Sequence, residues 1–232
     1  LGRQNFYNYA RQFAVGEPTG VELPAEAKGQ IREPEKWFGD SLASMSIGYE
    51  IGVTALQTAT AFATIANDGI KVKPHLIKEI RTSDGKVVQA TEAERLPVVN
   101  AETARGLGRM LRAVVLTGTG KRAQLNGYTS AGKTGTAWKY DPKLKKVSAS
   151  KYVSSFAGFA PAENPSVVIS VVLDEPQGGA RDGGQVSAPI FREIAEQIFD
   201  LPIRRGRPTG FDGGKHSRRR GNKTALGGEK SG

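Results

Sequence analysis

The chain has 232 residues, enough for one good-sized domain, or two small ones, with an apolar core. It contains no cysteine, which excludes disulfides, thiolate metal sites and a cysteine nucleophile, and its two histidines are too few for a histidine-rich metal site. No window approaches 18 consecutive apolar residues, so no membrane-spanning helix is predicted. The net charge of +10 gathers at the end of the chain, where residues 201–232 hold nine Lys or Arg against two acidic residues.

The first 70 residues predict two helices joined by an irregular connection. Apolar residues at helical spacing predict a short amphipathic helix that ends at Gly16; they are Phe6, Tyr9, Ala10 and Phe13. Residues 17–41 are rich in Pro, Gly and charge, which predicts an irregular segment. Thr54 and Gln57 then form a capping box, so we expect a buried helix that stops at Asn67-Asp68-Gly69.

The next elements predict a hairpin and a second long helix. Two β-leaning runs surround Asp84-Gly85 in residues 75–90, which is typical of a hairpin, and His75 is interpreted as a strand-end residue without a catalytic role. Asn100 is placed to cap a helix over residues 101–116, with its end at Thr117-Gly118.

The last third predicts paired strands, a helix and a tail. Residues 151–162 and 166–176 predict two strands that a short turn makes antiparallel. Ser187 is predicted to start a final helix with Pro189 in its first turn and with one apolar face; that face comprises Ile190, Phe191, Ile194, Ala195 and Ile198. Residues 201–232 are basic, Gly-rich and poor in aliphatic residues, which predicts a disordered tail without specific nucleic-acid binding.

Residues 126–138, with the sequence NGYTSAGKTGTAW, match two unrelated motifs. Gly127 to Thr134 satisfies the phosphate-loop pattern of nucleotide-binding proteins, and Asp174-Glu175 at the end of an apolar strand could then hold magnesium. A phosphate loop works because its Lys and Thr begin a helix whose amides face the phosphates. Here Thr134 is followed by another Gly, a β-branched residue and an aromatic, which favour a strand. Nucleotide binding is therefore the disfavoured alternative.

As a strand, the same residues suit an acyl-transfer site. Alternation places Lys133, Gly135 and Ala137 on one face, with Thr134 and Thr136 on the other. An edge strand can bind an extended peptide main chain to main chain, and Gly135 leaves room for it. Lys133 and the two Thr hydroxyls can bind a carboxylate, and the backbone N–H of Thr136 can stabilise an oxyanion.

Four blocks in order make this motif specific: residues 45–80, 131–137, 156–176 and 183–194. Together they resemble the C-terminal part of the transpeptidase domain of class B penicillin-binding proteins, closest to the septal peptidoglycan D,D-transpeptidase, over residues 1–200. The resemblance implies an α+β fold of the penicillin-binding protein/serine β-lactamase type, a partial domain whose antiparallel sheet is flanked by helices. It implies that Lys133, Thr134, Gly135 and Thr136 bind the substrate, with the Thr136 amide in the oxyanion hole.

The resemblance also implies a chemistry and its partners. A serine attacks the penultimate carbonyl of a stem peptide ending in D-Ala-D-Ala, the acyl group passes to an amine of a neighbouring strand, and β-lactams acylate the same serine. No cofactor or metal is implied. The whole protein would lie on the extracytoplasmic face of the bacterial inner membrane through an N-terminal anchor, with cell-division proteins as possible partners.

This chemistry also uses two further motifs, S-x-x-K and S-x-N, and neither is found in a usable form. No S-x-N occurs, and S-x-x-K occurs only at Ser83, Ser130 and Ser148, none of which is predicted to open a helix. We therefore expect a fragment whose serine nucleophile lies upstream and which is inactive alone. The alternative is a non-catalytic module that binds peptidoglycan or division proteins.

Overall fold

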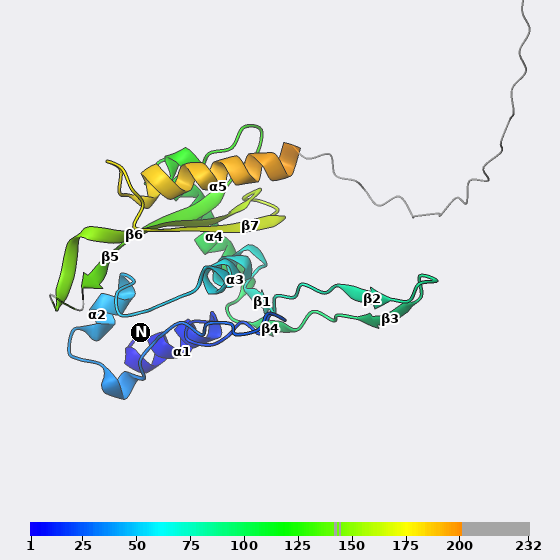
Figure 1. The fold of residues 1–232 in the computed structure, drawn as a ribbon, viewed down its shortest axis with the longest axis horizontal. Helices are drawn as coiled ribbons and strands as arrows, with labels where there is room; N and C mark the ends of the chain where they lie inside the picture. The colour runs from blue at the N-terminus through cyan, green and yellow to red at the C-terminus, as the bar shows by residue number, and fades with distance from the viewer. Residues whose placement is uncertain (142, 144, 201–232) are drawn as a thin grey trace, which may run out of the picture. The chain divides into compact units, whose positions relative to one another are not determined.

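The computed structural model describes residues 1–141, 143 and 145–200 (Figure 1), which all belong to one compact unit. The tail predicted to be disordered, residues 201–232, lies outside the described residues. No helix in the described part of the chain is long and apolar enough to cross a membrane.

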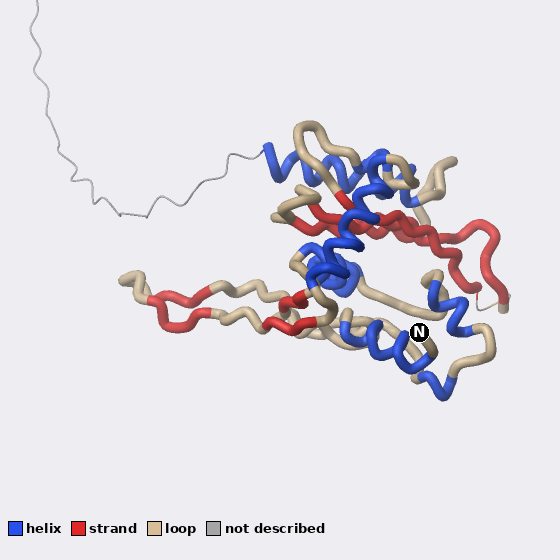
Figure 2. Tube along the Cα trace, turned by 180° about the vertical axis from the view of Figure 1, so that it is seen from behind, coloured by secondary structure: helices blue, strands red, loops and turns tan. Residues whose placement is uncertain are grey.

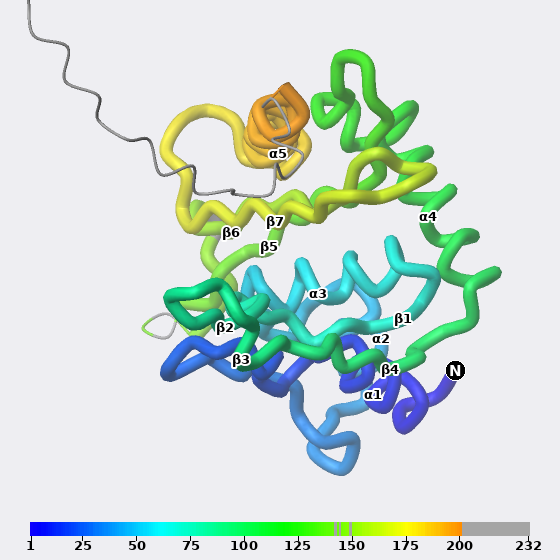
Figure 3. Tube along the Cα trace, turned by 90° about the vertical axis from the view of Figure 1, so that its right-hand side faces the viewer, coloured from blue at the N-terminus to red at the C-terminus, as the bar shows by residue number. Residues whose placement is uncertain are grey.

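An antiparallel sheet of three strands organises the second half of the chain. Its order is β5 (Ala131–Asp141), β6 (Lys146–Ala160) and β7 (Val167–Asp174), so β5 and β7 are the edge strands of the described sheet. Figure 3 shows α5 (Gly183–Asp200) on one face of this sheet and α3 (Ala55–Ala66) on the other. Helix α4 (Ala101–Leu116) contacts β5 and α3. The predicted sheet flanked by helices is confirmed.

The core between the sheet and α5 forms around two phenylalanines. Phe156 of β6 and Phe191 of α5 are fully buried, and their ring centroids lie 4.8 Å apart. Small residues surround them and let the helix approach the strands closely; the buried members are Val115, Ala123, Val171, Ala188 and Ala195.

Helix α5 begins at Gly183, four residues before the predicted start at Ser187. Ser187 does not cap the helix; its buried hydroxyl lies 3.0 Å from the hydroxyl of Ser154 on β6. Pro189 consequently sits inside the helix, where it cannot donate to the carbonyl of Gln185. Arg122 of the short helix η2 (Lys121–Ala123) donates to that carbonyl instead, at 3.3 Å.

The predicted caps of α3 and α4 are confirmed. Thr54 and Gln57 form the reciprocal capping box, and the Asn100 side chain accepts from the Thr103 amide at 2.7 Å. Gln57 is also buried, and its Nε2 donates to the carbonyls of Glu17 at 2.6 Å and Lys28 at 2.9 Å. The capping residue therefore also fixes the irregular connection that precedes the helix.

The N-terminal elements form a second, smaller core. Helix α1 (Arg3–Gln12) is confirmed, but its buried residue is Tyr7, whereas Tyr9 of the predicted face is 44% exposed. Tyr7 packs with Trp37 and Met45. Trp37 directly follows the short helix η1 (Pro34–Lys36), and Met45 lies in the short helix α2 (Ser41–Ser46). Neither short helix is apparent from the sequence pattern.

The predicted hairpin is confirmed as β2 (Glu79–Arg81) paired with β3 (Val87–Ala90). Figure 2 shows it reaching away from the helices and the main sheet. The hairpin is inserted between β1 (Ile70–Val72) and β4 (Arg95–Pro97), which pair with each other as a second two-stranded sheet. The sequence analysis did not predict this second sheet. His75 is exposed in the connection between β1 and β2, so the prediction that it lies at the end of a strand is wrong.

Candidate active site

The K-T-G residues lie inside β5, as the strand interpretation predicts. The two faces of the strand meet different partners. Thr136 is directed toward the start of α5, because its Oγ1 accepts from the Gly183 amide at 3.2 Å. On the opposite face, a Cβ added to Gly135 would lie 2.4 Å from the Ser155 hydroxyl of β6. A side chain at position 135 would therefore require the Ser155 hydroxyl to move, besides filling any room that Gly135 leaves for a peptide.

Lys133 and Thr134 form a small polar group at the exposed edge of β5. The Lys133 ammonium donates to the Thr134 carbonyl at 2.9 Å, and its side chain stays exposed to solvent. The Thr134 hydroxyl lies 2.8 Å from the hydroxyl of Thr119, which follows α4. An ammonium and hydroxyl groups held beside each other can bind a carboxylate through charge-assisted hydrogen bonds.

Two glycines that the sequence analysis did not select complete this region. A Cβ on Gly183 would lie 2.1 Å from the Ser155 carbonyl oxygen, and one on Gly184 would lie 2.2 Å from the Thr119 carbonyl oxygen. Only glycine lets the first turn of α5 approach β5 this closely. The signal was the Gly-Gly pair at 183–184, which the predicted helix start at Ser187 left outside the helix.

A cavity of about 560 Å³ opens where these groups meet. Lys133, Thr134 and Thr136 of β5 line it together with Thr119 and residues 182–185. Lys121 and Arg122 add two positive charges at its wall, against the single carboxylate of Asp182. The cavity thus combines a positive field with hydroxyl groups beside the free edge of a strand, which suits an extended peptide with a terminal carboxylate.

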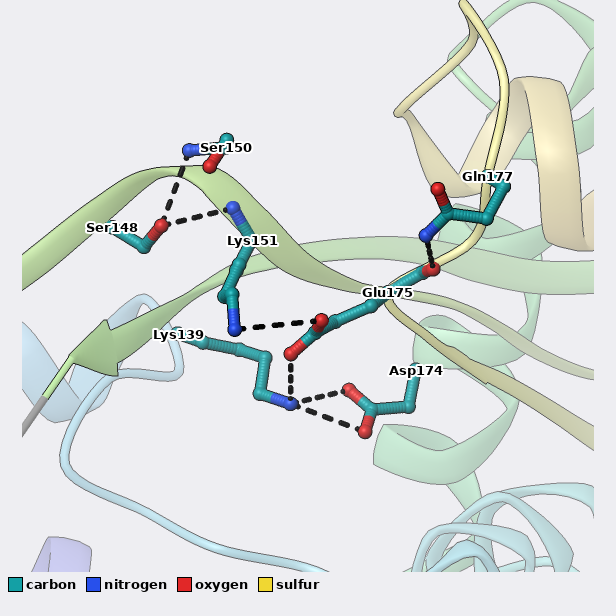
Figure 4. Close-up of polar contacts among 7 residues, drawn as sticks. All are labelled: Lys139, Ser148, Ser150, Lys151, Asp174, Glu175 and Gln177. Atoms are coloured by element: carbon teal, nitrogen blue, oxygen red, sulfur yellow. Dashed lines mark hydrogen bonds and ion pairs between the residues drawn. The ribbon is translucent and has the colours of Figure 1, made fainter.

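None of the three S-x-x-K matches forms a nucleophile at the start of a helix. Ser83 lies in the hairpin turn, and the buried Ser130 hydroxyl donates to the Ala123 carbonyl at 2.7 Å. Ser148 lies inside β6, and its hydroxyl accepts from the Lys151 amide at 3.0 Å. Figure 4 shows the Lys151 ammonium directed toward Glu175 and away from that hydroxyl. These serines lack the Ser–Lys pairing that the chemistry requires.

The structure also argues against the phosphate-loop alternative. Lys133 and Thr134 lie in the middle of an extended strand, so they present no helix N-terminus to a phosphate. Asp174 and Glu175 do not form a free acidic pair either, because the Lys139 ammonium lies 2.9 Å and 2.7 Å from their carboxylates. The described part of the chain contains no group of three His, Cys, Asp or Glu side chains that could hold a metal ion.

Comparison with known proteins identifies the fold and its family. The family model described as the penicillin-binding protein transpeptidase domain matches residues 1–196. The chain belongs to this family. The predicted resemblance is thereby confirmed at the level of the transpeptidase domain.

Relatives and solved structures agree with this assignment. The transpeptidase-domain chain is 40% identical over 208 residues to penicillin-binding protein PbpB of Mycolicibacterium smegmatis. The alignment covers 86% of this chain and 32% of that protein. It is 31% identical to the probable peptidoglycan D,D-transpeptidase FtsI of Caulobacter vibrioides, with 85% and 34% covered. Penicillin-binding protein 3 of Mycobacterium tuberculosis complexed with ampicillin aligns with a TM-score of 0.79 at 35% identity, covering 86% of this chain and 46% of that one. The chain thus spans about a third of the length of the curated relatives it matches.

Proposed function

We propose that this transpeptidase-domain chain is the substrate-binding part of a serine D,D-transpeptidase that cross-links peptidoglycan stem peptides during cell division. The observation that carries the proposal is the convergence of Lys133, Thr134 and Thr136 with the start of α5 on one cavity, beside the free edge of β5. The C-terminal carboxylate of a D-Ala-D-Ala peptide binds Lys133 and Thr134, and the peptide adds to β5 as a further strand.

The amide of Thr136 then donates to the carbonyl oxygen of the penultimate residue as it becomes an oxyanion. The serine nucleophile and its base come from the S-x-x-K and S-x-N motifs, which this chain does not contain in a usable form. β-Lactams would occupy the same cavity in the whole protein. We place that protein at the extracytoplasmic face of the cytoplasmic membrane, with division proteins as partners.

Peptide binding to the 232-residue chain tests the substrate site directly. We expect acetyl-D-Ala-D-Ala to shift the amide resonances of residues 131–137 and 183–185 in a nuclear magnetic resonance titration. The carboxamide-terminated peptide and acetyl-L-Ala-L-Ala serve as controls and should bind at least several-fold more weakly. Lys133→Ala should weaken binding roughly tenfold, because a hydrogen bond to a charged group contributes about 1.5–3 kcal/mol. Binding that ignores the carboxylate or leaves β5 unshifted would contradict the proposal.

Acylation tests the catalytic part of the proposal. Incubated with benzylpenicillin and weighed intact, the chain alone should carry no adduct; a serine adduct would show that it contains a nucleophile. Residues 1–196 should support penicillin labelling when they replace the matching segment of the M. smegmatis relative. Lys133→Ala in that chimera should slow labelling at least tenfold. A folded chimera that binds the peptide but is never labelled would favour the non-catalytic binding module.

A further inference from the structure

The loop between β7 and α5, residues 175–182, presents an arginine at the end of the candidate site. Arg181 is exposed, and its guanidinium carbon lies 5.9 Å from the ring centroid of Trp138 on β5 and 6.0 Å from that of Tyr152 on β6. No carboxylate pairs with Arg181 among residues 1–141, 143 and 145–200, although Asp182 is its neighbour in the chain. A guanidinium has five N–H donors, so contacts with two rings leave its hydrogen-bonding capacity unused.

The loop is anchored at its start by ion pairs. Figure 4 shows the Lys139 ammonium of β5 between the carboxylates of Asp174 and Glu175, while Gln177 donates to the Glu175 carbonyl at 2.9 Å. These pairs raise the pKa of Lys139, chiefly through the hydrogen bond to Glu175 and then the one to Asp174. The Lys139 ammonium thus connects the end of β7 to β5.

Further contacts attach the loop to β6 and β5. The buried Tyr152 donates its hydroxyl toward the carbonyls of Pro176 at 3.3 Å and Ala180 at 3.1 Å. Directly after the loop, the Gly183 amide donates to Thr136. The backbone of Arg181 therefore lies between two attachment points, and its exposed guanidinium lies over the Trp138 ring of β5.

The register of a bound peptide shows what Arg181 would meet. If the Thr136 amide donates to the attacked carbonyl, and the terminal carboxylate lies toward Lys133, the peptide runs antiparallel to β5. The acyl-donating residue is then opposite Thr136, and the residue two positions before it is opposite Trp138. Directly opposite residues place their side chains on the same face, about 5 Å apart. For an L-residue this is the face of Thr136, Trp138 and Arg181.

We propose that Arg181, which lies over Trp138, binds a carboxylate carried by the acyl-donor peptide two residues before the acyl-donating residue. Arg181 is thus a specificity-determining residue that favours an acidic over an amidated or neutral peptide at this position. The inference rests on the proposed function, because it takes its register from the Thr136 amide. An arginine suits this role better than a lysine, since its planar fork can both stack on an indole and bind a carboxylate with two donors.

The test compares isosteric peptides on the full 232-residue chain by nuclear magnetic resonance titration. The probes are acetyl-Glu-Ala-D-Ala-D-Ala and acetyl-Gln-Ala-D-Ala-D-Ala, which differ only in the charge of the first residue. We expect the Glu peptide to bind about fivefold more tightly, and the difference to shrink in 1 M salt because the pair is exposed. Acetyl-Ala-Glu-D-Ala-D-Ala, with its carboxylate one residue closer and on the other face, should have no such advantage.

Matched variants assign the effect to one side chain. Arg181→Gln should abolish the difference in affinity between the Glu and Gln peptides, and Arg181→Lys should keep only part of it. Arg109→Gln, at an exposed arginine of α4 that does not line the candidate cavity, should keep the fivefold preference. Equal binding of the two peptides to the unmodified chain, with β5 resonances still shifting, would overturn the inference and leave the proposed function standing. Failure of the Gln peptide to shift β5 would instead overturn the proposed function, and the inference with it.

Discussion

Substitution of Gly183 by alanine tests how closely α5 must approach the K-T-G strand. The added Cβ would lie 2.1 Å from the Ser155 carbonyl oxygen and 2.6 Å from the Gly135 carbonyl oxygen. Both atoms belong to the backbones of paired strands, which cannot turn aside as a flexible side chain can. Relief requires the first turn of α5 to retreat by more than 1 Å, to the 3.4 Å or more of an ordinary contact. The retreat would also break the hydrogen bond from Gly183 to Thr136.

The expected cost follows from these two losses. Overpacking contributes about 1–3 kcal/mol, and the lost hydrogen bond contributes about 1 kcal/mol. The sum, about 2–4 kcal/mol, should lower Tm by roughly 4–16 °C in a unit of this size. Thermal unfolding followed by circular dichroism measures the shift.

Gly179→Ala is the matched control, because it lies in the loop that leads to Gly183 and an added Cβ there meets nothing within 4 Å. Its stability should change by less than about 0.5 kcal/mol. D-Ala-D-Ala binding should weaken in Gly183→Ala at temperatures where the variant is still folded, since the Thr136 hydroxyl loses its partner. A Tm within 2 °C of the unmodified chain would refute the argument that glycine is required for this approach.

Three further predictions concern the rest of the fold. Gln57→Leu leaves two backbone carbonyls of the preceding connection without their donor and removes half of the capping box, so unfolding free energy should fall by about 2–3 kcal/mol in urea titrations. Asn100→Ala should lower it by about 1 kcal/mol through the lost cap of α4, and Asn100→Gly by only a few tenths. The hydrogen bond from Thr129, then one from its own backbone amide, and then the charge of Arg112 hold the pKa of Glu163 below its ordinary value of 4.5. Its contribution is therefore complete above pH 4.5 and is lost as the pH falls through the lower folded-state pKa, so the Tm difference between the unmodified chain and Glu163→Gln should shrink steadily as the pH is lowered below 4.5. A difference that does not change as the pH is lowered would assign the effect to packing.

The elements predicted correctly are those whose signals lie within a few residues. The capping box of Thr54 and Gln57, the cap at Asn100 and the turn at Asp84-Gly85 each use neighbours three residues apart or fewer. The K-T-G segment behaves in the same way, because the residues after Thr134 already exclude a helix. Such signals are readable from sequence since the hydrogen bonds that they make are local.

The predictions that failed depended on distant partners. The Ser-Ala-Pro sequence from Ser187 is a good local start signal, yet α5 begins at Gly183 because glycine alone fits against β5 and β6. Tyr7, and not Tyr9, is buried in α1, since the partners that cover it, Trp37 and Met45, lie about 30 residues or more further along the chain. Helical spacing gives the period of an apolar face but does not tell which side is covered.

The sequence by itself determined the family, the strand character of the K-T-G segment and the main capped helices, because each rests on motifs and short-range hydrogen bonds. Only the tertiary structure decided that Lys133, Thr134 and Thr136 share a cavity with the start of α5, and that Arg181 lies over Trp138. Those groups are separated by about 45 residues of chain and are brought together by strand register and by close packing at glycines. Register and close approach are set by the summed burial of the whole unit, which no short segment encodes.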